Sequence, residues 1–183
     1  MDRLKESLKK LVVSDKGIAD LAKKVFADSN MILDIGSGDE SLGLLTLKTI
    51  MKDSGKKIES LDNDPKAGAD ITASADEVPR NDEDYDGIFA SHVLEHLDEP
   101  EKALEEWKRL LKKEGRLLIV VPFKEMKQKH HKIVFTSPNQ LKELAEKCGF
   151  RKIRVEQRLW LKCFQSFFGR LMKKGDLILV CKK

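Results

Sequence analysis

The strongest constraint on the fold is an alternation of apolar runs and helical patterns between residues 31 and 123. The run MILDI ends on the triplet Gly36-Ser37-Gly38, and SLGLLTLKTIMK then places apolar residues at helical spacing. Three further apolar runs follow, and the helical pattern EPEKALEEWKRLLKKEG, closed by Gly115, precedes the strand RLLIVVPF. Such alternation is typical of a parallel sheet with helices on both faces, so we expect an α/β fold.

The same reading extends to both ends of the chain. Residues 2–13 and 18–27 carry apolar side chains at helical spacing. Residues 137–149 predict a helix, and strands follow around residues 152–156 and at residues 176–183. We find no linker, repeat or low-complexity tract, so we expect one domain.

Composition and charge bear on where the protein is located and on what it binds. The longest apolar run, LLIVVPF, is too short to span a bilayer, and the first residues lack the pattern of a signal peptide. We therefore expect a cytoplasmic protein that is not integral to a membrane. Residues 1–123 carry 19 Lys and Arg against 26 Asp and Glu, whereas residues 124–183 carry 16 against 5. The basic last third either faces an anionic partner or is simply a solvated surface.

The glycine triplet is not a dinucleotide fingerprint. G-x-G-x-x-G requires a third glycine where the chain has Ser41, and Asp39 and Glu40 occupy the start of the following helix. Two carboxylates there would repel a pyrophosphate. A nucleoside ligand with positive charge and no phosphate fits this charge distribution, and S-adenosylmethionine is such a ligand.

Five segments, in order, resemble the motifs of class I S-adenosylmethionine-dependent methyltransferases, particularly the small type-11-like group: LDIGSG, LDNDP, ADEVP, YDGIFASHVLEHL and LLKKEGRLLIVVP. The resemblance implies a Rossmann-like α/β fold with a seven-stranded, mostly parallel sheet, helices on both faces, and an antiparallel last strand inserted beside the fifth. It also implies S-adenosylmethionine as cofactor. Within a single domain of residues 1–183, we expect N-terminal helices in 1–28, a cofactor-binding core in 29–123, and substrate-side loops with the final helix and strands in 124–183.

The resemblance further assigns roles to individual residues. Asp34 would orient the methionine ammonium, Asp62 would accept hydrogen bonds from both ribose hydroxyls, and Asp76 would bind the adenine amine. The full set implied to bind the cofactor is Asp34, Gly36, Ser37, Gly38, Asp62, Asn63, Ala75, Asp76 and Ser91. Two positions depart from the family pattern: Glu40 replaces a common third glycine, and Ser74 stands where an acidic residue is usual on the adenine side.

The histidines are the candidates for catalysis. His92-Val-Leu-Glu95-His96 matches H-x-x-E-H, a pattern that on a helix can hold zinc. The segment directly follows a buried strand and no third ligand is evident nearby in the sequence, so we expect no metal. An imidazole can instead remove a proton from the methyl acceptor near neutral pH. The candidates are His92, His96, His130 and His131.

Three functions remain open from the sequence. The first is methylation of a small acceptor, anionic or partly apolar. The second is methylation of RNA or protein through the basic last third, although no N-P-P-Y motif follows the fourth strand. The third is a non-catalytic cofactor-binding or scaffold protein. Apolar residues at roughly helical spacing from Trp160 to Met172 predict core or homodimer packing, a lid over an apolar acceptor, or shallow contact with anionic lipid.

Overall fold

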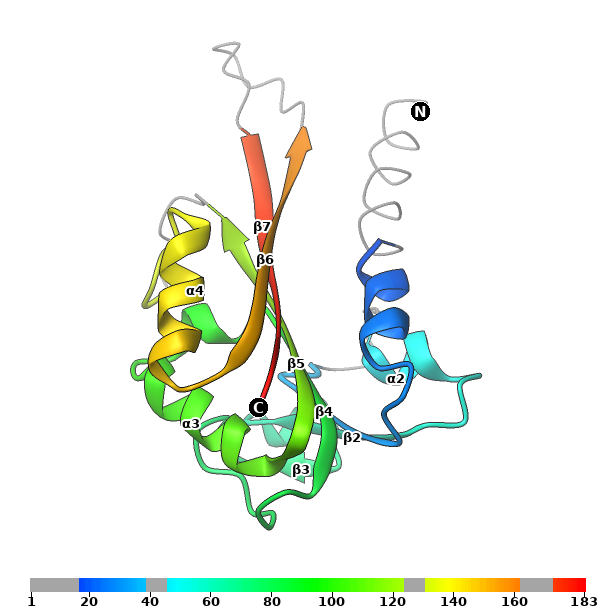
Figure 1. The fold of residues 1–183 in the computed structure, drawn as a ribbon. Coiled ribbons are helices and arrows are strands. Elements are labelled where there is room, and N and C mark those ends of the chain that lie inside the picture. Colours follow the sequence, from blue (N-terminus) through cyan, green and yellow to red (C-terminus); the bar gives the residue numbers. More distant parts are fainter. Residues whose placement is uncertain (1–16, 39–45, 124–130, 162–172) are drawn as a thin grey trace.

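The structure, a computed structural model, describes residues 17–38, 46–123, 131–161 and 173–183. One sheet of seven strands organises them, in the order β3-β2-β1-β4-β5-β7-β6 (Figure 1). The strands are β1 (Met31–Ile35), β2 (Lys57–Asp62), β3 (Ile71–Thr72), β4 (Tyr85–Ser91), β5 (Leu111–Phe123), β6 (Arg151–Leu161) and β7 (Lys173–Lys182). The first five are parallel, and β7 runs antiparallel between β5 and β6. The expected Rossmann-like sheet and the inserted antiparallel last strand are confirmed.

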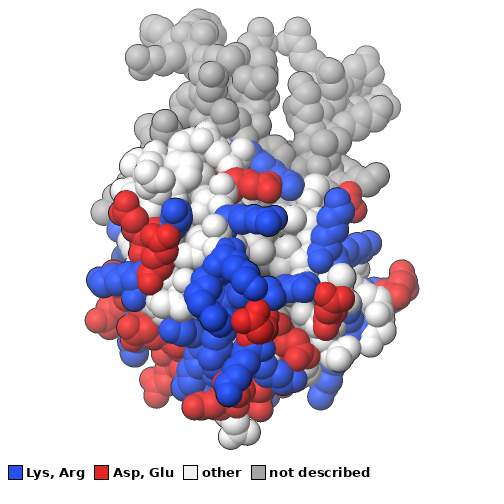
Figure 2. Space-filling view, in the orientation of Figure 1, with Lys and Arg blue, Asp and Glu red and all other residues white. Residues whose placement is uncertain are grey.

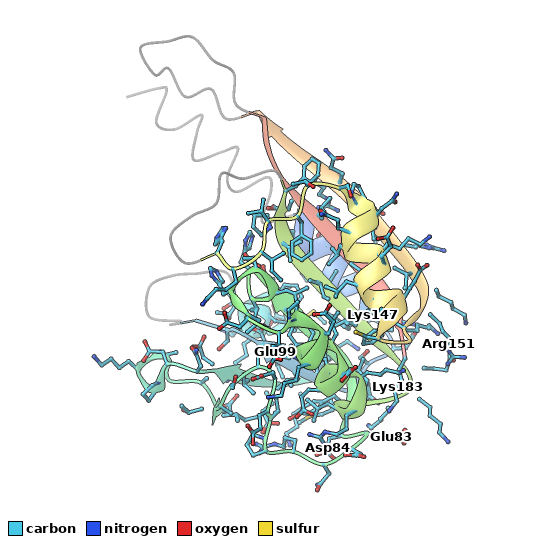
Figure 3. The ribbon with its side chains drawn as sticks, turned by 90° about the vertical axis from the view of Figure 1, so that its left-hand side faces the viewer. Glu83, Asp84, Glu99, Lys147, Arg151 and Lys183 are labelled. Atoms are coloured by element: carbon cyan, nitrogen blue, oxygen red, sulfur yellow. The ribbon has the colours of Figure 1, made fainter. Side chains whose placement is uncertain are left out.

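Helices cover both faces of the sheet, as expected. Residues 17–25 are helical and lie with α2 (Leu47–Met51) on one side, whereas α3 (Pro100–Leu110) and α4 (Pro138–Lys147) lie on the other (Figures 1 and 3). Each side has its own apolar cluster, because alternate residues of a strand point to opposite faces. Trp107 of α3 and Phe26 are fully buried in the two clusters.

The sequence of α4 specifies its own start. Ser137 is the N-cap, its side chain accepts from the Gln140 amide, and the Gln140 side chain accepts from the Ser137 amide in return. Gly149, with φ of +77°, follows the helix end.

Replacing Ser137 by alanine is expected to lower the free energy of unfolding by about 1 kcal/mol, because the first turn loses its reciprocal cap. Urea denaturation followed by circular dichroism measures this. Asn139→Ala, at an exposed position of the same turn, is the control and should change stability by less. Equal losses in the two variants would contradict the capping role.

Some predicted boundaries differ from the structure. The helix predicted to end at Gly115 ends at Leu110, because Leu111 is fully buried and already pairs with Tyr85. The backbone of Trp160 is in β6 rather than in a helix. Residues 2–13, Glu40, His130 and residues 162–172 lie outside the described residues. Among the described helices, none is long and apolar enough to cross a membrane.

The basic last third and the acidic first two thirds of the sequence are not separated in the fold, where several of their charged side chains form ion pairs. Lys182 and Arg151 pair with Glu114 at 3.0 and 3.2 Å, and Lys183 pairs with Glu83 at 3.2 Å. Figure 3 labels Lys183 and Glu83, and Figure 2 shows basic side chains interspersed with acidic ones on the face in view. Part of the positive charge of the last third is therefore neutralised by the acidic first two thirds.

Candidate functional site

The carboxyl ends of three neighbouring strands are level at one edge of the sheet. Ile35, the last residue of β1, pairs with Leu61 of β2 and with Ala90 of β4. The next residues along the chain, Gly36, Asp62 and Ser91, therefore lie side by side at this edge. In an open parallel sheet, ligands bind beyond this edge.

The glycine turn closes tightly over β2. The amides of Gly36 and Ser37 both donate to the Leu61 carbonyl, at 2.7 and 3.2 Å. Gly36 and Gly38 have φ values of +68° and +66°, in the left-handed region that favours glycine. A Cβ at Gly36 would lie 2.3 Å from Cγ2 of Val93, a distance that atoms cannot adopt without a shift. The turn thus requires glycine at position 36 for both backbone and space.

Asp62 connects the turn to the following loop. Its Oδ2 accepts from the Gly38 amide and its Oδ1 from the Asp64 amide, each at 2.9 Å. A carboxylate has about four acceptor positions, so both oxygens keep capacity for a further donor. The side chain is only partly buried, which leaves it accessible to a ligand.

Asp34 is buried at the end of β1, with 2% of its surface exposed. Its Oδ2 accepts from the amide of Leu47, the first residue of α2, at 3.0 Å. This hydrogen bond fixes the start of α2 against β1. Asp34 therefore has a structural role beside the one implied by the family resemblance.

The residues expected on the adenine side lie beyond β2 and β3. Asn63 is exposed, and the carbonyl of buried Ala75 accepts from Trp107 Nε1 at 2.7 Å. The Asp76 carboxylate accepts from the Ser74 hydroxyl and from Lys102 Nζ, the latter at 3.0 Å. These hydrogen bonds, that of Ser74 first, lower the pKa of Asp76. Ser74, which departs from the family pattern, is thus linked directly to the acid expected to bind adenine.

The segment after β4 turns sharply toward a short 3-10 helix, η3 (Leu94–His96). His92 has φ of +56°, and its amide donates to the Val120 carbonyl at 2.8 Å. The H-x-x-E-H segment is therefore not a regular α-helix. Glu95 nevertheless lies close to both of its histidines, 3.3 Å from His92 Nδ1 and 3.9 Å from His96 Nε2.

The fold brings His131 to this segment from 35 residues further along the chain. The amides of Lys132 and Ile133 both donate to the Glu95 carbonyl, at 2.8 and 3.2 Å. The rings of His131 and His96 meet edge to face with 5.0 Å between centroids. Three of the four candidate histidines are thus near Glu95, and the fourth, His130, is not described.

Sequence reasoning missed two residues here. Glu95 is in the motif but was not among the candidate catalytic residues, and it is 1% exposed. Asp176 of β7 has its Oδ1 3.8 Å from His92 Nε2. The motif itself points to Glu95, whereas Asp176 has no signal in the sequence because only the insertion of β7 beside β5 brings it close.

A surface hollow of about 370 Å³ lies apart from the glycine turn. None of the predicted cofactor residues lines it. Its lining comes from the segment before α3, from the start of α3, from α4 and from the segment between β5 and α4: Asp98, Pro100, Glu101, Ile133, Phe135, Gln140 and Leu144.

The chain is similar to known proteins in sequence and in structure. Residues 33–119 match the family described as Methyltransferase domain. An uncharacterized protein of Methanocaldococcus jannaschii is 29% identical in an alignment of 102 residues, and the match covers 49% of this chain and 50% of the relative. The chain therefore matches about half the length of this curated relative.

Two solved structures show the fold. A SAM-dependent methyltransferase from Archaeoglobus fulgidus has a TM-score of 0.72 at 19% identity and covers 95% of this chain and 94% of its own. Phosphoethanolamine N-methyltransferase 2 of Haemonchus contortus, in complex with phosphomonomethylethanolamine and S-adenosylhomocysteine, has a TM-score of 0.64 at 15% identity. That match covers 84% of this chain and 49% of the other.

Proposed function

We propose that the chain is a class I S-adenosylmethionine-dependent methyltransferase that transfers the methyl group of S-adenosylmethionine to a small acceptor, because residues 33–119 match the family described as Methyltransferase domain and the fold is that of a solved methyltransferase. The observation that carries the proposal is the left-handed Gly36-Ser37-Gly38 turn, held on Leu61 and Asp62 at the carboxyl edge of the sheet. Because its glycines have no side chain, this turn lets a ligand approach the backbone closely at the carboxyl edge of the sheet, where open α/β sheets bind ligands.

The cofactor would lie along this edge. Asp62 would accept from the ribose hydroxyls, and the glycine turn would pack against the methionine part, whose ammonium Asp34 would orient. The adenine would lie beside Asn63, Ala75 and Asp76, and Ser91 would present its backbone to the methionine. The complex of the Haemonchus enzyme with S-adenosylhomocysteine supports a ligand of this class in this fold.

Methyl transfer would follow an in-line displacement. A lone pair of the acceptor atom forms the new bond to the methyl carbon, the carbon–sulfur bond breaks, and its electrons neutralise the sulfonium to give S-adenosylhomocysteine. Because the leaving group is already activated, positioning the acceptor supplies most of the rate. A base is needed only to take the acceptor proton, and His92, His96 and His131 are the candidates near β4.

A small acceptor agrees with the described surface better than a nucleic acid does. Several cations of the last third are paired with carboxylates, and such pairing leaves fewer charges to neutralise phosphates. The nucleic-acid and protein alternatives remain predictions. Binding that falls steeply as the salt concentration rises would favour them over a small acceptor.

The test is release of S-adenosylhomocysteine from the purified chain with S-adenosylmethionine and pools of small acceptors carrying hydroxyl, amine or thiol groups. We expect release that requires both the cofactor and one pool, with methyl label recovered in an acceptor from that pool. If cofactor binds but only RNA or protein substrates become labelled, the small-acceptor proposal is wrong.

A further inference from the structure

We propose that Glu95, His96 and His131 form a binding site for one divalent transition-metal cation of the Zn²⁺ type, beside the cofactor turn. One possible ligand atom from each of the three residues lies within 4.8 Å of the other two. In a tetrahedral site with bonds of about 2.1 Å, ligand atoms are about 3.4 Å apart. Small side-chain rotations therefore suffice to close the site around an ion.

The burial of the Glu95 carboxylate without a hydrogen-bond donor among the described residues indicates that it binds a ligand. It is 1% exposed, and neither of its oxygens accepts a hydrogen bond from the described residues. Burying a charged carboxylate without adequate partners is strongly destabilising. A cation between Glu95 and the two imidazoles would offset this cost.

The donor set indicates the class of metal. Two imidazoles and one carboxylate suit Zn²⁺ and similar transition metals, whereas Mg²⁺ and Ca²⁺ prefer oxygen ligands throughout. Three protein ligands leave a fourth position open, which is the pattern of catalytic zinc sites. The His96 side chain is 43% exposed, so the site is accessible from solvent at that ligand.

The backbone holds the three ligands together without the metal. Glu95 and His96 are consecutive in η3, and the two hydrogen bonds to the Glu95 carbonyl fix the chain directly after His131. His131 itself is 7% exposed. The fold thus brings to the H-x-x-E-H motif a candidate ligand, His131, that is not evident nearby in the sequence.

His92 extends the cluster on the other side of Glu95. Its Nδ1 is 3.3 Å from Glu95 and its Nε2 is 3.8 Å from Asp176. An imidazole between two carboxylates orients the inner one, as outer partners of metal ligands commonly do. We assign His92 as a positioning residue for Glu95.

The site would serve the acceptor, a role that rests on the proposed function. Val93, two residues before Glu95, lies so close to Gly36 that a Cβ on Gly36 would clash with it. The start of η3 therefore lies beside the Gly36-Ser37-Gly38 turn. A cation there would take an acceptor oxygen in its open position and lower the pKa of an acceptor hydroxyl. With the cation bound, His96 and His131 would be its ligands rather than bases, so the hydroxyl proton would leave to solvent. The oxygen lone pair would then attack the methyl carbon as the carbon–sulfur bond breaks.

The test measures metal binding in the absence of S-adenosylmethionine. The chain is treated with chelator, exchanged into chelator-free buffer and titrated with ZnCl₂ by calorimetry, and bound zinc is counted by elemental analysis. We expect one ion per chain and at least a 100-fold weaker affinity in Glu95→Gln and in His96→Ala. Glu99→Gln, labelled in Figure 3 at the start of α3 and exposed, is the matched control and should bind as the wild type.

Stability separates the metal from a simple cluster of hydrogen-bonded histidines. With chelator present, Glu95→Gln should melt at the same temperature as the wild type or higher, because it removes an unsatisfied buried charge. With zinc present, the wild type should melt higher and the variant should not respond. Absence of binding by the folded wild type, or binding that Glu95→Gln and His96→Ala leave unchanged, overturns the proposal.

Cofactor binding measured in chelator keeps the two proposals apart. If the wild-type chain binds S-adenosylmethionine in chelator but does not bind zinc when zinc is added, only the metal site is refuted. Zinc binding by a chain that does not bind S-adenosylmethionine would refute the proposed function and leave the metal site standing.

Discussion

Gly36→Ala is expected to weaken S-adenosylmethionine binding strongly, because the turn must shift to make room for the added Cβ and would then no longer offer its backbone to the cofactor in the same place. Alanine at φ of +68° costs about 1 to 2 kcal/mol, and the added Cβ would lie 2.3 Å from Val93 Cγ2. The crowding adds about 1 to 3 kcal/mol. The free energy of unfolding should therefore fall as well, which urea denaturation measures beside calorimetric binding.

Two variants separate backbone strain from crowding at Gly36. Gly55 has the same conformation, with φ of +69°, but no atom lies within 4 Å of a Cβ built on it. Gly55→Ala should therefore lose only the smaller part of the stability and keep cofactor binding. Val93→Ala should restore part of what Gly36→Ala loses, because Val93 Cβ is 3.6 Å away, at an ordinary contact distance. Cofactor binding by the single variant equal to the wild type would contradict the assigned turn.

Asp62→Ala is expected to weaken S-adenosylmethionine binding by about 1 to 3 kcal/mol, which is roughly 5- to 150-fold. The ribose hydroxyls would lose a charged acceptor, and the amides of Gly38 and Asp64 would lose their shared partner. Binding of adenine alone should change little, because it has no ribose. Calorimetry with the two ligands measures the difference.

Asp53→Ala is the control for Asp62, since Asp53 is exposed in the turn that follows α2. It should bind S-adenosylmethionine as the wild type does. A folded Asp62→Ala variant with unchanged affinity would show that the ribose lies elsewhere and that Asp62 only holds the turn.

The sheet was predictable because its signals are local or imposed by the family pattern. MILDI, YDGIFAS and RLLIVVPF are apolar runs of strand length, and each forms a strand. The strand order and the place of β7 came from the family resemblance, since no periodicity specifies which strands are neighbours. Helix boundaries were less predictable: the pattern up to Gly115 suits a helix, but pairing of Leu111 with Tyr85 ends α3 earlier.

The cofactor edge was predictable for the same reason, and the histidine cluster was not. Gly36, Asp62 and Ser91 follow three strands directly, so a parallel sheet is enough to align them. His131 approaches Glu95 only through hydrogen bonds between distant backbone groups, and Asp176 approaches His92 only through the antiparallel insertion. The spacing of these residues in the sequence does not indicate that His131 lies near Glu95 or that Asp176 lies near His92.

Titration calorimetry of the wild-type chain with S-adenosylmethionine and with S-adenosylhomocysteine measures whether this chain binds the cofactor, and it does not require the acceptor. We expect one site per chain that both ligands occupy in competition, with dissociation constants in the micromolar range, about −8 kcal/mol. A folded chain that binds neither ligand up to millimolar concentration would contradict the claim, and the domain would then be a scaffold without the cofactor.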